Sequence, residues 1–131
     1  MDLDRFKVHT LQQLDLVARK VALEVFKGVI MDTPVKSGRA RGNWQCTIGA
    51  PASGDTERAD QIAVGSPGGA AFAEVVNIGQ SWKAISGVSI LLTNNLPYIG
   101  RLNAGSSKQT PARFVERNVM RVGGIVQEAT P

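Results

Sequence analysis

The sequence predicts an α+β fold, in which a small antiparallel sheet is packed by a long N-terminal helix, a middle helix and a C-terminal helix. Three patterns support this prediction. Apolar residues recur every three or four positions near the N-terminus, residues 44–48 and 88–93 have strand-like composition, and helical spacing returns near the C-terminus. The chain has 131 residues, which suits a single domain spanning 1–131.

The first expected element is one helix from residue 3 to about residue 32. One apolar stripe consists of Leu14, Val17, Val21, Val25 and Val29, and a second, on the C-terminal half, of Leu16, Leu23, Phe26 and Ile30. A helix of roughly 28 residues is about 42 Å long, more than a domain of this size covers with its own core. We therefore expect part of it to pack on another subunit, with Leu23, Phe26 and Ile30 as interface residues.

The next segment is expected to contain short strands and loops. Thr33-Pro34 ends the helix, because the residue before a proline avoids the helical region. Residues 36–43 form a basic, glycine-containing connection, and 44–48 alternate as a half-buried strand. Residues 49–60 lack periodicity and are expected to form a flexible loop. Ile62 and Val64 indicate one further short strand.

The second half of the chain predicts a helix over 70–83, a strand over 88–93 and a short helical turn over 97–102. Gly79 inside the middle helix costs about 1 kcal/mol relative to Ala. Thr110-Pro111 predicts the start of the final helix, as an N-cap followed by proline at the first helical position. Gly123-Gly124 is expected to loosen or kink its end.

The composition argues against catalysis. With His9 and Cys46 as the only histidine and cysteine, the common triads and zinc sites cannot be built within one chain. We expect no enzyme activity, no cofactor and no metal site, and we expect Cys46 to be a buried thiol beside Trp44. The first residues lack an apolar run and no apolar run approaches about 18 residues, so we expect no signal peptide, no membrane contact and folding in a cytoplasm.

The formal net charge of +4 is only mildly basic. Its densest cluster is Lys36, Arg39 and Arg41, and Trp44 lies close enough in sequence to stack on a base. Non-specific DNA contact through this cluster is therefore one hypothesis. We favour a solvated loop or a subunit contact made by the arginines.

Two segments resemble the neck and tail-completion family of tailed bacteriophages, which includes minor tail protein Z-like sequences. Residues 32–44 read DTPVKSGRARGNW, and residues 92–116 read LTNNLPYIGRLNAGSSKQTPARFVE. The first pattern is filled by Thr33, Pro34, Val35, Ser37, Gly38, Arg39, Arg41, Asn43 and Trp44, and the second by Asn94, Asn95, Pro97, Tyr98, Leu102, Gly105, Ser107, Gln109 and Pro111. Their order, spacing and flanking helices extend the resemblance over nearly the whole chain. Thr110-Pro111-Ala112-Arg113 departs from the commoner Ala-Pro-x-Gly.

The resemblance implies a structural virion protein of the phage neck, assembled in the host cytoplasm. Such a protein forms a homo-oligomeric ring, often a hexamer, that completes the tail and joins it to the DNA-filled head. Its partners would be copies of itself, head-completion or connector proteins and tail-tube proteins, with non-specific contact to channel DNA. The motif residues would then shape the fold and the ring interface, and Tyr98 and Leu102 would pack against the first helix.

Three alternatives stay open. The protein could be a tail terminator that caps tube polymerisation, or a small DNA-contacting protein that uses Lys36, Arg39 and Arg41. The motif residues could also serve only to hold the monomer together. The sequence leaves open the ring stoichiometry, the neighbouring virion proteins, the host and whether the tail is contractile.

Overall fold

The predicted α+β fold is confirmed by a computed structural model of the chain, which describes residues 3–129, with side-chain burial for residues 12–128. His9 lies outside the described side chains. The elements are α1 (Leu3–Asp32), α2 (Arg39–Gly42), β1 (Gln45–Ile48), α3 (Ala70–Ser81), the 3-10 helix η1 (Ala84–Ser86), β2 (Ile90–Thr93), α4 (Ile99–Asn103), α5 (Phe114–Met120) and α6 (Val122–Ala129).

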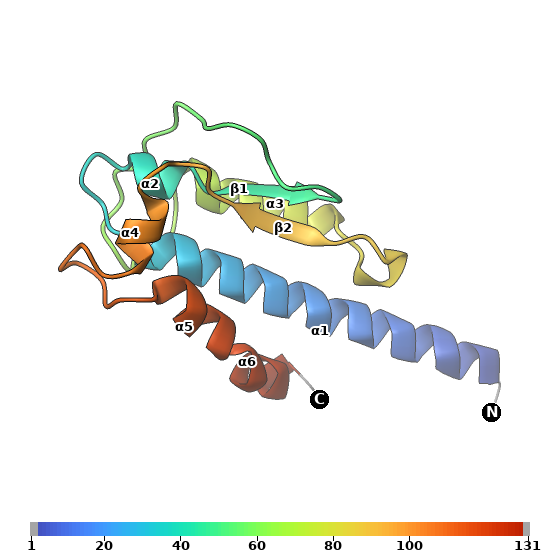
Figure 1. The fold of residues 1–131 in the computed structure, drawn as a ribbon. Coiled ribbons are helices and arrows are strands. Elements are labelled where there is room, and N and C mark those ends of the chain that lie inside the picture. The colour runs from blue at the N-terminus through green and yellow to red at the C-terminus, as the bar shows by residue number, and fades with distance from the viewer. Residues whose placement is uncertain (1–2, 130–131) are drawn as a thin grey trace.

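Helix α1 is the axis on which the other elements are arranged. The sheet and α3 lie on one side of α1, and α5 and α6 lie on the other, while α2 and α4 gather around its C-terminal end (Figure 1). The N-terminal turns of α1 project past the body of the protein (Figure 1). No helix among the described residues is both long enough and apolar enough to span a membrane.

The sheet consists of β1 and β2 in antiparallel register, with Gln45 opposite Thr93 and Ile48 opposite Ile90. Both strands begin one or two residues later than predicted. The short strand predicted at Ile62 and Val64 is wrong, because these residues form no strand. The backbone groups of this segment bond elsewhere: the Ala63 carbonyl oxygen accepts from Arg41 Nη1, and the Gly65 N–H donates to the Met31 carbonyl oxygen at the end of α1.

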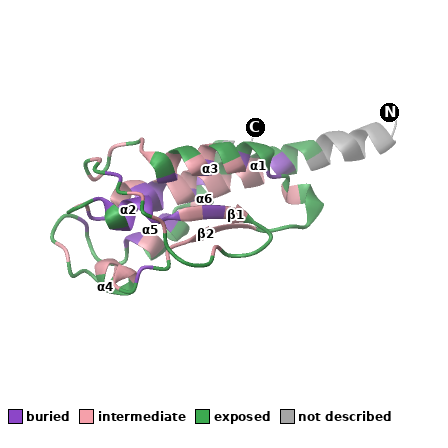
Figure 2. Ribbon diagram, turned by 90° about the horizontal axis from the view of Figure 1, so that it is seen from above, coloured by how far each residue is buried: buried purple, intermediate pink, exposed green. Residues whose placement is uncertain are grey.

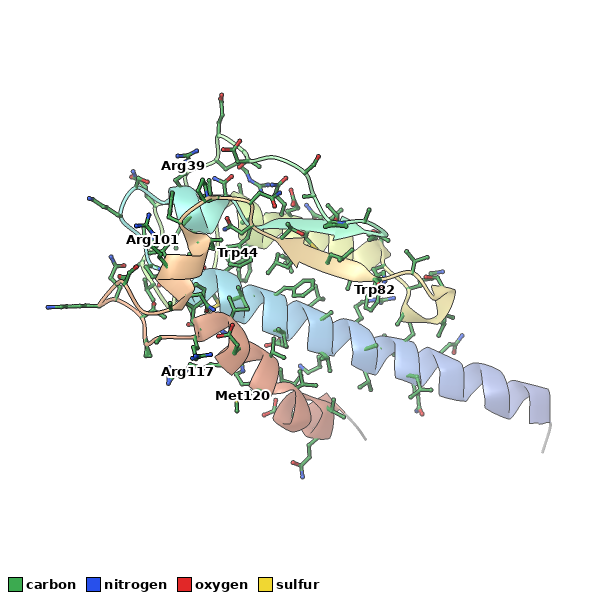
Figure 3. The ribbon with its side chains drawn as sticks, viewed as in Figure 1. Arg39, Trp44, Trp82, Arg101, Arg117 and Met120 are labelled. Carbon is green, nitrogen blue, oxygen red and sulfur yellow. The ribbon has the colours of Figure 1, made fainter. Side chains whose placement is uncertain are left out.

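The core lies where the C-terminal half of α1, α3, β1 and α5 meet (Figure 2). It contains Val29, Ile30, Trp44, Cys46, Ala71, Val75 and Phe114. Trp44 lies between the sheet and α1 (Figure 3). The burial predicted for Cys46 is confirmed, but the alternation ends at Ile48, which is 41% exposed.

The stripe predicted as a subunit interface on α1 packs against the core of this chain, which leaves Ile30 inaccessible and Leu23 and Phe26 partly exposed. Ile30 is fully buried in this chain, and Leu23 and Phe26 pack against the same core. The reason is α3, which covers this stripe: Gly79 lets α3 come so close that a Cβ atom there would overlap the Leu23 side chain. Among the described side chains, the exposed leucines are Leu14 and Leu16, at 58% and 59%.

The final helix begins later than predicted and is divided in two. Thr110 does not cap it, because α5 starts only at Phe114, after Arg113 in the left-handed region (φ +63°). The Thr110 hydroxyl donates instead to the carbonyl oxygen of Asp32, at 2.6 Å. The helical path breaks at Arg121, just before Gly123-Gly124, so the predicted kink is confirmed two residues early.

Contact between α1 and α5 depends on a buried asparagine. Asn118 is 1% exposed, and its amide donates to Asp32 Oδ2 at 2.9 Å and to the Phe114 carbonyl oxygen at 2.8 Å. Its oxygen accepts from Arg121 Nη1 at 3.0 Å. On the facing turn of α1, a Cβ at Gly28 would overlap this amide.

We therefore expect Gly28→Ala to destabilise the protein by about 1–3 kcal/mol, the usual cost of overpacking. Urea unfolding would measure the change in the free energy of unfolding. Gly100→Ala is the matched control, because Gly100 is also helical and nothing lies within 4 Å of a Cβ there. Equal stability of the Gly28 variant and the wild type would show that Asn118 does not constrain the helix contact.

Candidate functional site

The two segments that carry the resemblance meet in the structure. Val35 and Gln109, 74 residues apart, exchange two hydrogen bonds of 2.9 Å, one from the Val35 N–H to Gln109 Oε1 and one from Gln109 Nε2 to the Val35 carbonyl oxygen. Asn94 Nδ2 donates to the Ala40 carbonyl oxygen at 2.9 Å. Side-chain amides thus join the two segments through backbone groups, as a strand partner would.

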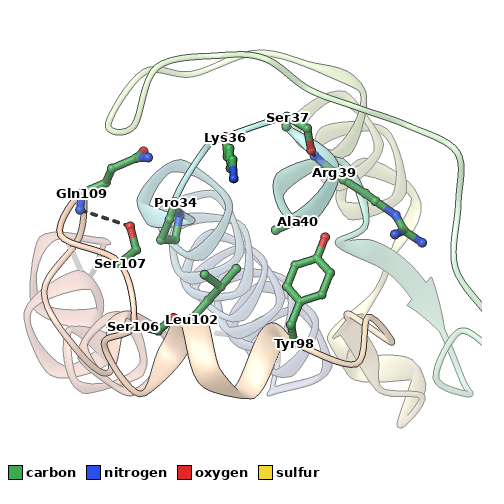
Figure 4. Close-up of a pocket in the computed structure, with 11 residues that line it drawn as sticks. Pro34, Lys36, Ser37, Arg39, Ala40, Tyr98, Leu102, Ser106, Ser107 and Gln109 are labelled. Atoms are coloured by element: carbon green, nitrogen blue, oxygen red, sulfur yellow. Dashed lines mark hydrogen bonds between the residues drawn. The ribbon is translucent and has the colours of Figure 1, made fainter.

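A pocket of about 410 Å³ opens between these segments (Figure 4). The lining residues are Pro34, Lys36, Ser37, Gly38, Arg39, Ala40, Tyr98, Leu102, Ser106, Ser107 and Gln109. Leu102 and Pro34 lie on the same side of the pocket (Figure 4), and Leu102 packs against the core. The Tyr98 ring lies across the pocket from it, with its hydroxyl next to Ala40 of α2.

Thr33 joins the end of α1 to the start of the sheet. Its buried hydroxyl donates to the Val29 carbonyl oxygen at 2.7 Å and accepts from Trp44 Nε1 at 2.8 Å. Trp44 is 7% exposed, so its indole cannot stack on a base. Gly38 supports the turn between them with φ +84°, where a Cβ would lie 2.5 Å from the Asp60 carbonyl carbon.

Arg41 is not available for DNA or subunit contact, which corrects the role predicted for it. The side chain is fully buried, and Nη2 donates to the carbonyl oxygens of Ser66 at 2.6 Å and Gly68 at 3.0 Å. Nη1 donates to the Ala63 carbonyl oxygen at 3.4 Å. Burial lowers the pKa of Arg41, and nearby Asp60 opposes that shift. Arg41 therefore holds residues 63–68 against α2.

Lys36 and Arg39 are the members of the basic cluster that stay exposed. Arg39 lies on the outer surface (Figure 3) and forms an ion pair with Asp55, at 3.1 Å between Nη2 and Oδ2. Both side chains of this pair are about half exposed, so it contributes little to stability. It does offset the charge that Arg39 would present to a nucleic acid.

Motif residues also tie down the loop that the sequence predicts to be flexible. The Asn43 side chain accepts from the Thr56 N–H at 2.6 Å and donates to the Arg39 carbonyl oxygen at 2.8 Å. Asn95 Nδ2 donates to the carbonyl oxygens of Ala52 and Gly54, both at 2.8 Å. These hydrogen bonds join the loop to both motif segments, and the prediction of a flexible loop did not foresee them.

Arg58 and Glu74 are structural residues that the sequence analysis missed. Arg58 donates to the carbonyl oxygens of Gly42 and Trp44, both at 2.8 Å, and to Glu74 Oε2 at 2.7 Å. Glu74 Oε1 accepts from the Cys46 N–H at 2.7 Å, at the outer edge of β1. Single charges in an aperiodic loop and on a helix carry no sequence signal for such a pair.

The remaining motif residues either contact near neighbours in the sequence or are exposed. Ser107 Oγ accepts from the Gln109 N–H at 3.2 Å, and Gly105 lies against Ala112. Pro97 and Pro111 are exposed. Among the described residues, no three His, Cys, Asp or Glu side chains lie together in a way that could hold a metal ion.

Comparison with known proteins adds no assignment: no family model, curated protein or solved structure matches this chain.

The Cys46 thiol predicts a pH dependence of stability. Burial, together with the Glu74 charge, raises its pKa from 9.0 to about 11. Between these values the folded thiol keeps its proton while the unfolded thiol has lost it, so stability falls as the pH rises. The fall should reach about 1.4 kcal/mol per pH unit.

This effect is measured by urea unfolding under reducing conditions at pH 8, 9, 10 and 11, for the wild type and Cys46→Ala. The variant lacks the thiol, and its free energy of unfolding should decline less steeply over the upper part of this range. Parallel declines in the two proteins would contradict a strongly raised pKa.

Proposed function

We propose that the protein is a structural component of the neck of a tailed phage virion, where it forms a homo-oligomeric ring that completes the tail and joins it to the head. The resemblance of residues 32–44 and 92–116 supplies the neck assignment. The observation that carries the ring is the N-terminal half of α1, which exposes Leu14 and Leu16 on two different flanks.

Helix α1 is held to the body by one face at this level. Asp15 is 8% exposed, and its Oδ1 accepts from the Ala84 N–H at 2.5 Å. Its Oδ2 binds Arg19 Nη2 at 2.8 Å, and Arg19 Nε donates to the Trp82 carbonyl oxygen at 3.2 Å. An α-helix turns about 100° per residue, so Leu14 and Leu16 lie on opposite sides of the attached face.

This arrangement suits a ring. Head-to-tail assembly needs two different contact surfaces on every subunit, whereas a two-fold dimer needs only one. The Leu14 flank would contact one neighbour and the Leu16 flank the other, which covers both leucines. In the virion, the two faces of the ring would contact a head-completion or connector protein and a tail-tube protein.

We expect the double variant Leu14→Gln/Leu16→Gln to shift the chain toward the monomer, because glutamine removes apolar area from both flanks at once. Light scattering at high micromolar concentration would measure the mass of wild type and variant. Met120→Gln is the matched control, since Met120 is 82% exposed on α5, which meets α1 near Gly28 and Asp32. A wild-type protein that stays monomeric, both alone and mixed with its neighbouring virion proteins, would overturn the proposal of a ring.

Electron microscopy of particles made without the protein tests the place of the ring. Full heads beside unattached tails of normal length are the expected result, because joining would fail after both parts are complete. Overlong tail tubes would instead identify a tail terminator. Normal, infectious particles would overturn the proposed function.

A further inference from the structure

We propose that the pocket between the two motif segments binds a carboxylate carried next to an apolar side chain, on a segment of a partner polypeptide. The proposal rests on the proposed function only where it identifies the partner as a neighbouring virion protein. The binding chemistry itself follows from the lining residues.

The free polar groups of the pocket are hydrogen-bond donors. Lys36 points into the pocket (Figure 4), and its ammonium has no partner among the described residues. The hydroxyls of Tyr98 and Ser106 line the same space without a partner among those residues. The Ser107 hydroxyl accepts a hydrogen bond from Gln109, which leaves its own proton free to donate.

A charged acceptor is missing from the same surface. No Asp or Glu lines the pocket, and both ends of the Gln109 amide are occupied by Val35. A pocket that offers an ammonium and several hydroxyl protons selects a ligand rich in acceptor oxygens. Of the groups that a polypeptide can present, a carboxylate fits best.

The pocket also has an apolar side. Pro34, Ala40 and Leu102 line it, with Pro34 and Ala40 buried and Leu102 half-buried against the core. A free inorganic anion would leave these groups uncovered, whereas an apolar side chain beside the carboxylate would cover them.

The walls are already in place before any ligand binds. The Val35–Gln109 pair and the bond from Asn94 to Ala40 hold the two segments together. A preformed site pays less ordering cost on binding. Nucleic acid fits less well, because Arg41 is buried, Arg39 is paired with Asp55, and a phosphodiester has no apolar group for Pro34 and Leu102.

The test uses N-acetyl-leucine, which joins an apolar side chain to a carboxylate, and N-acetyl-leucinamide, which differs in having no charge. Amide chemical shifts of the 15N-labelled chain would be followed during titration. We expect N-acetyl-leucine to shift Ser37, Ala40 and Ser107 at millimolar concentration, and the amide to bind about tenfold more weakly or not at all. Inorganic phosphate and a short DNA duplex are titrated in parallel.

Lys36→Met removes the ammonium and keeps most of the length of the side chain, and should weaken N-acetyl-leucine binding about tenfold. Lys108→Met is the control, because Lys108 is exposed outside the lining and its loss should leave binding unchanged. Equal binding of both leucine probes, stronger binding of phosphate or DNA, or no binding at all would each overturn the proposal. All of these are read on the isolated chain, so they are independent of ring formation.

Discussion

The C-terminal end of α1 is buried, and its last four carbonyl groups have no partner within the helix. Each needs one, because an unpaired carbonyl in the interior costs free energy. Thr33 satisfies Val29 through its hydroxyl and Ile30 through its N–H, at 2.7 and 3.2 Å. The Gly65 N–H reaches Met31 at 2.7 Å, and the Thr110 hydroxyl reaches Asp32 at 2.6 Å. The first motif, the long loop and the second motif must therefore converge on this point. The pocket lies beside it for the same reason.

The elements with strong periodicity were predictable from the sequence, and the contacts that shape the pocket were not. The stripe of α1 and the composition of residues 88–93 depend on near neighbours, and both elements form as predicted. The Val35–Gln109 pair depends on positions 74 residues apart, which no local pattern connects. Thr110 illustrates the conflict between the two levels. Its hydroxyl could cap the N-terminus of a helix that starts at the next residue, but it donates a hydrogen bond to the carbonyl oxygen of Asp32 instead.

The charge of the chain has a different meaning in the structure than in the composition. Arg41 and Arg58 lie against backbone carbonyls, and Arg19 and Arg39 face carboxylates of the same chain. These four arginines therefore make contacts within the chain. Within the basic cluster of residues 36–41, Lys36 is the member that stays exposed with no carboxylate partner among the described residues, and it lines the pocket.

The outer edge of β1 has a consequence for how copies of this chain can associate. Glu74 accepts a hydrogen bond from the Cys46 N–H, and Arg58 donates one to the Trp44 carbonyl oxygen. These two backbone groups are therefore not available to pair with a further strand. Extending a sheet from molecule to molecule requires two open edges on every copy. With one of them closed by an ion pair, runaway fibre growth through this sheet is blocked. Copies of this chain that pair through the β1 edge would first have to break the contacts of Arg58 and Glu74 with it.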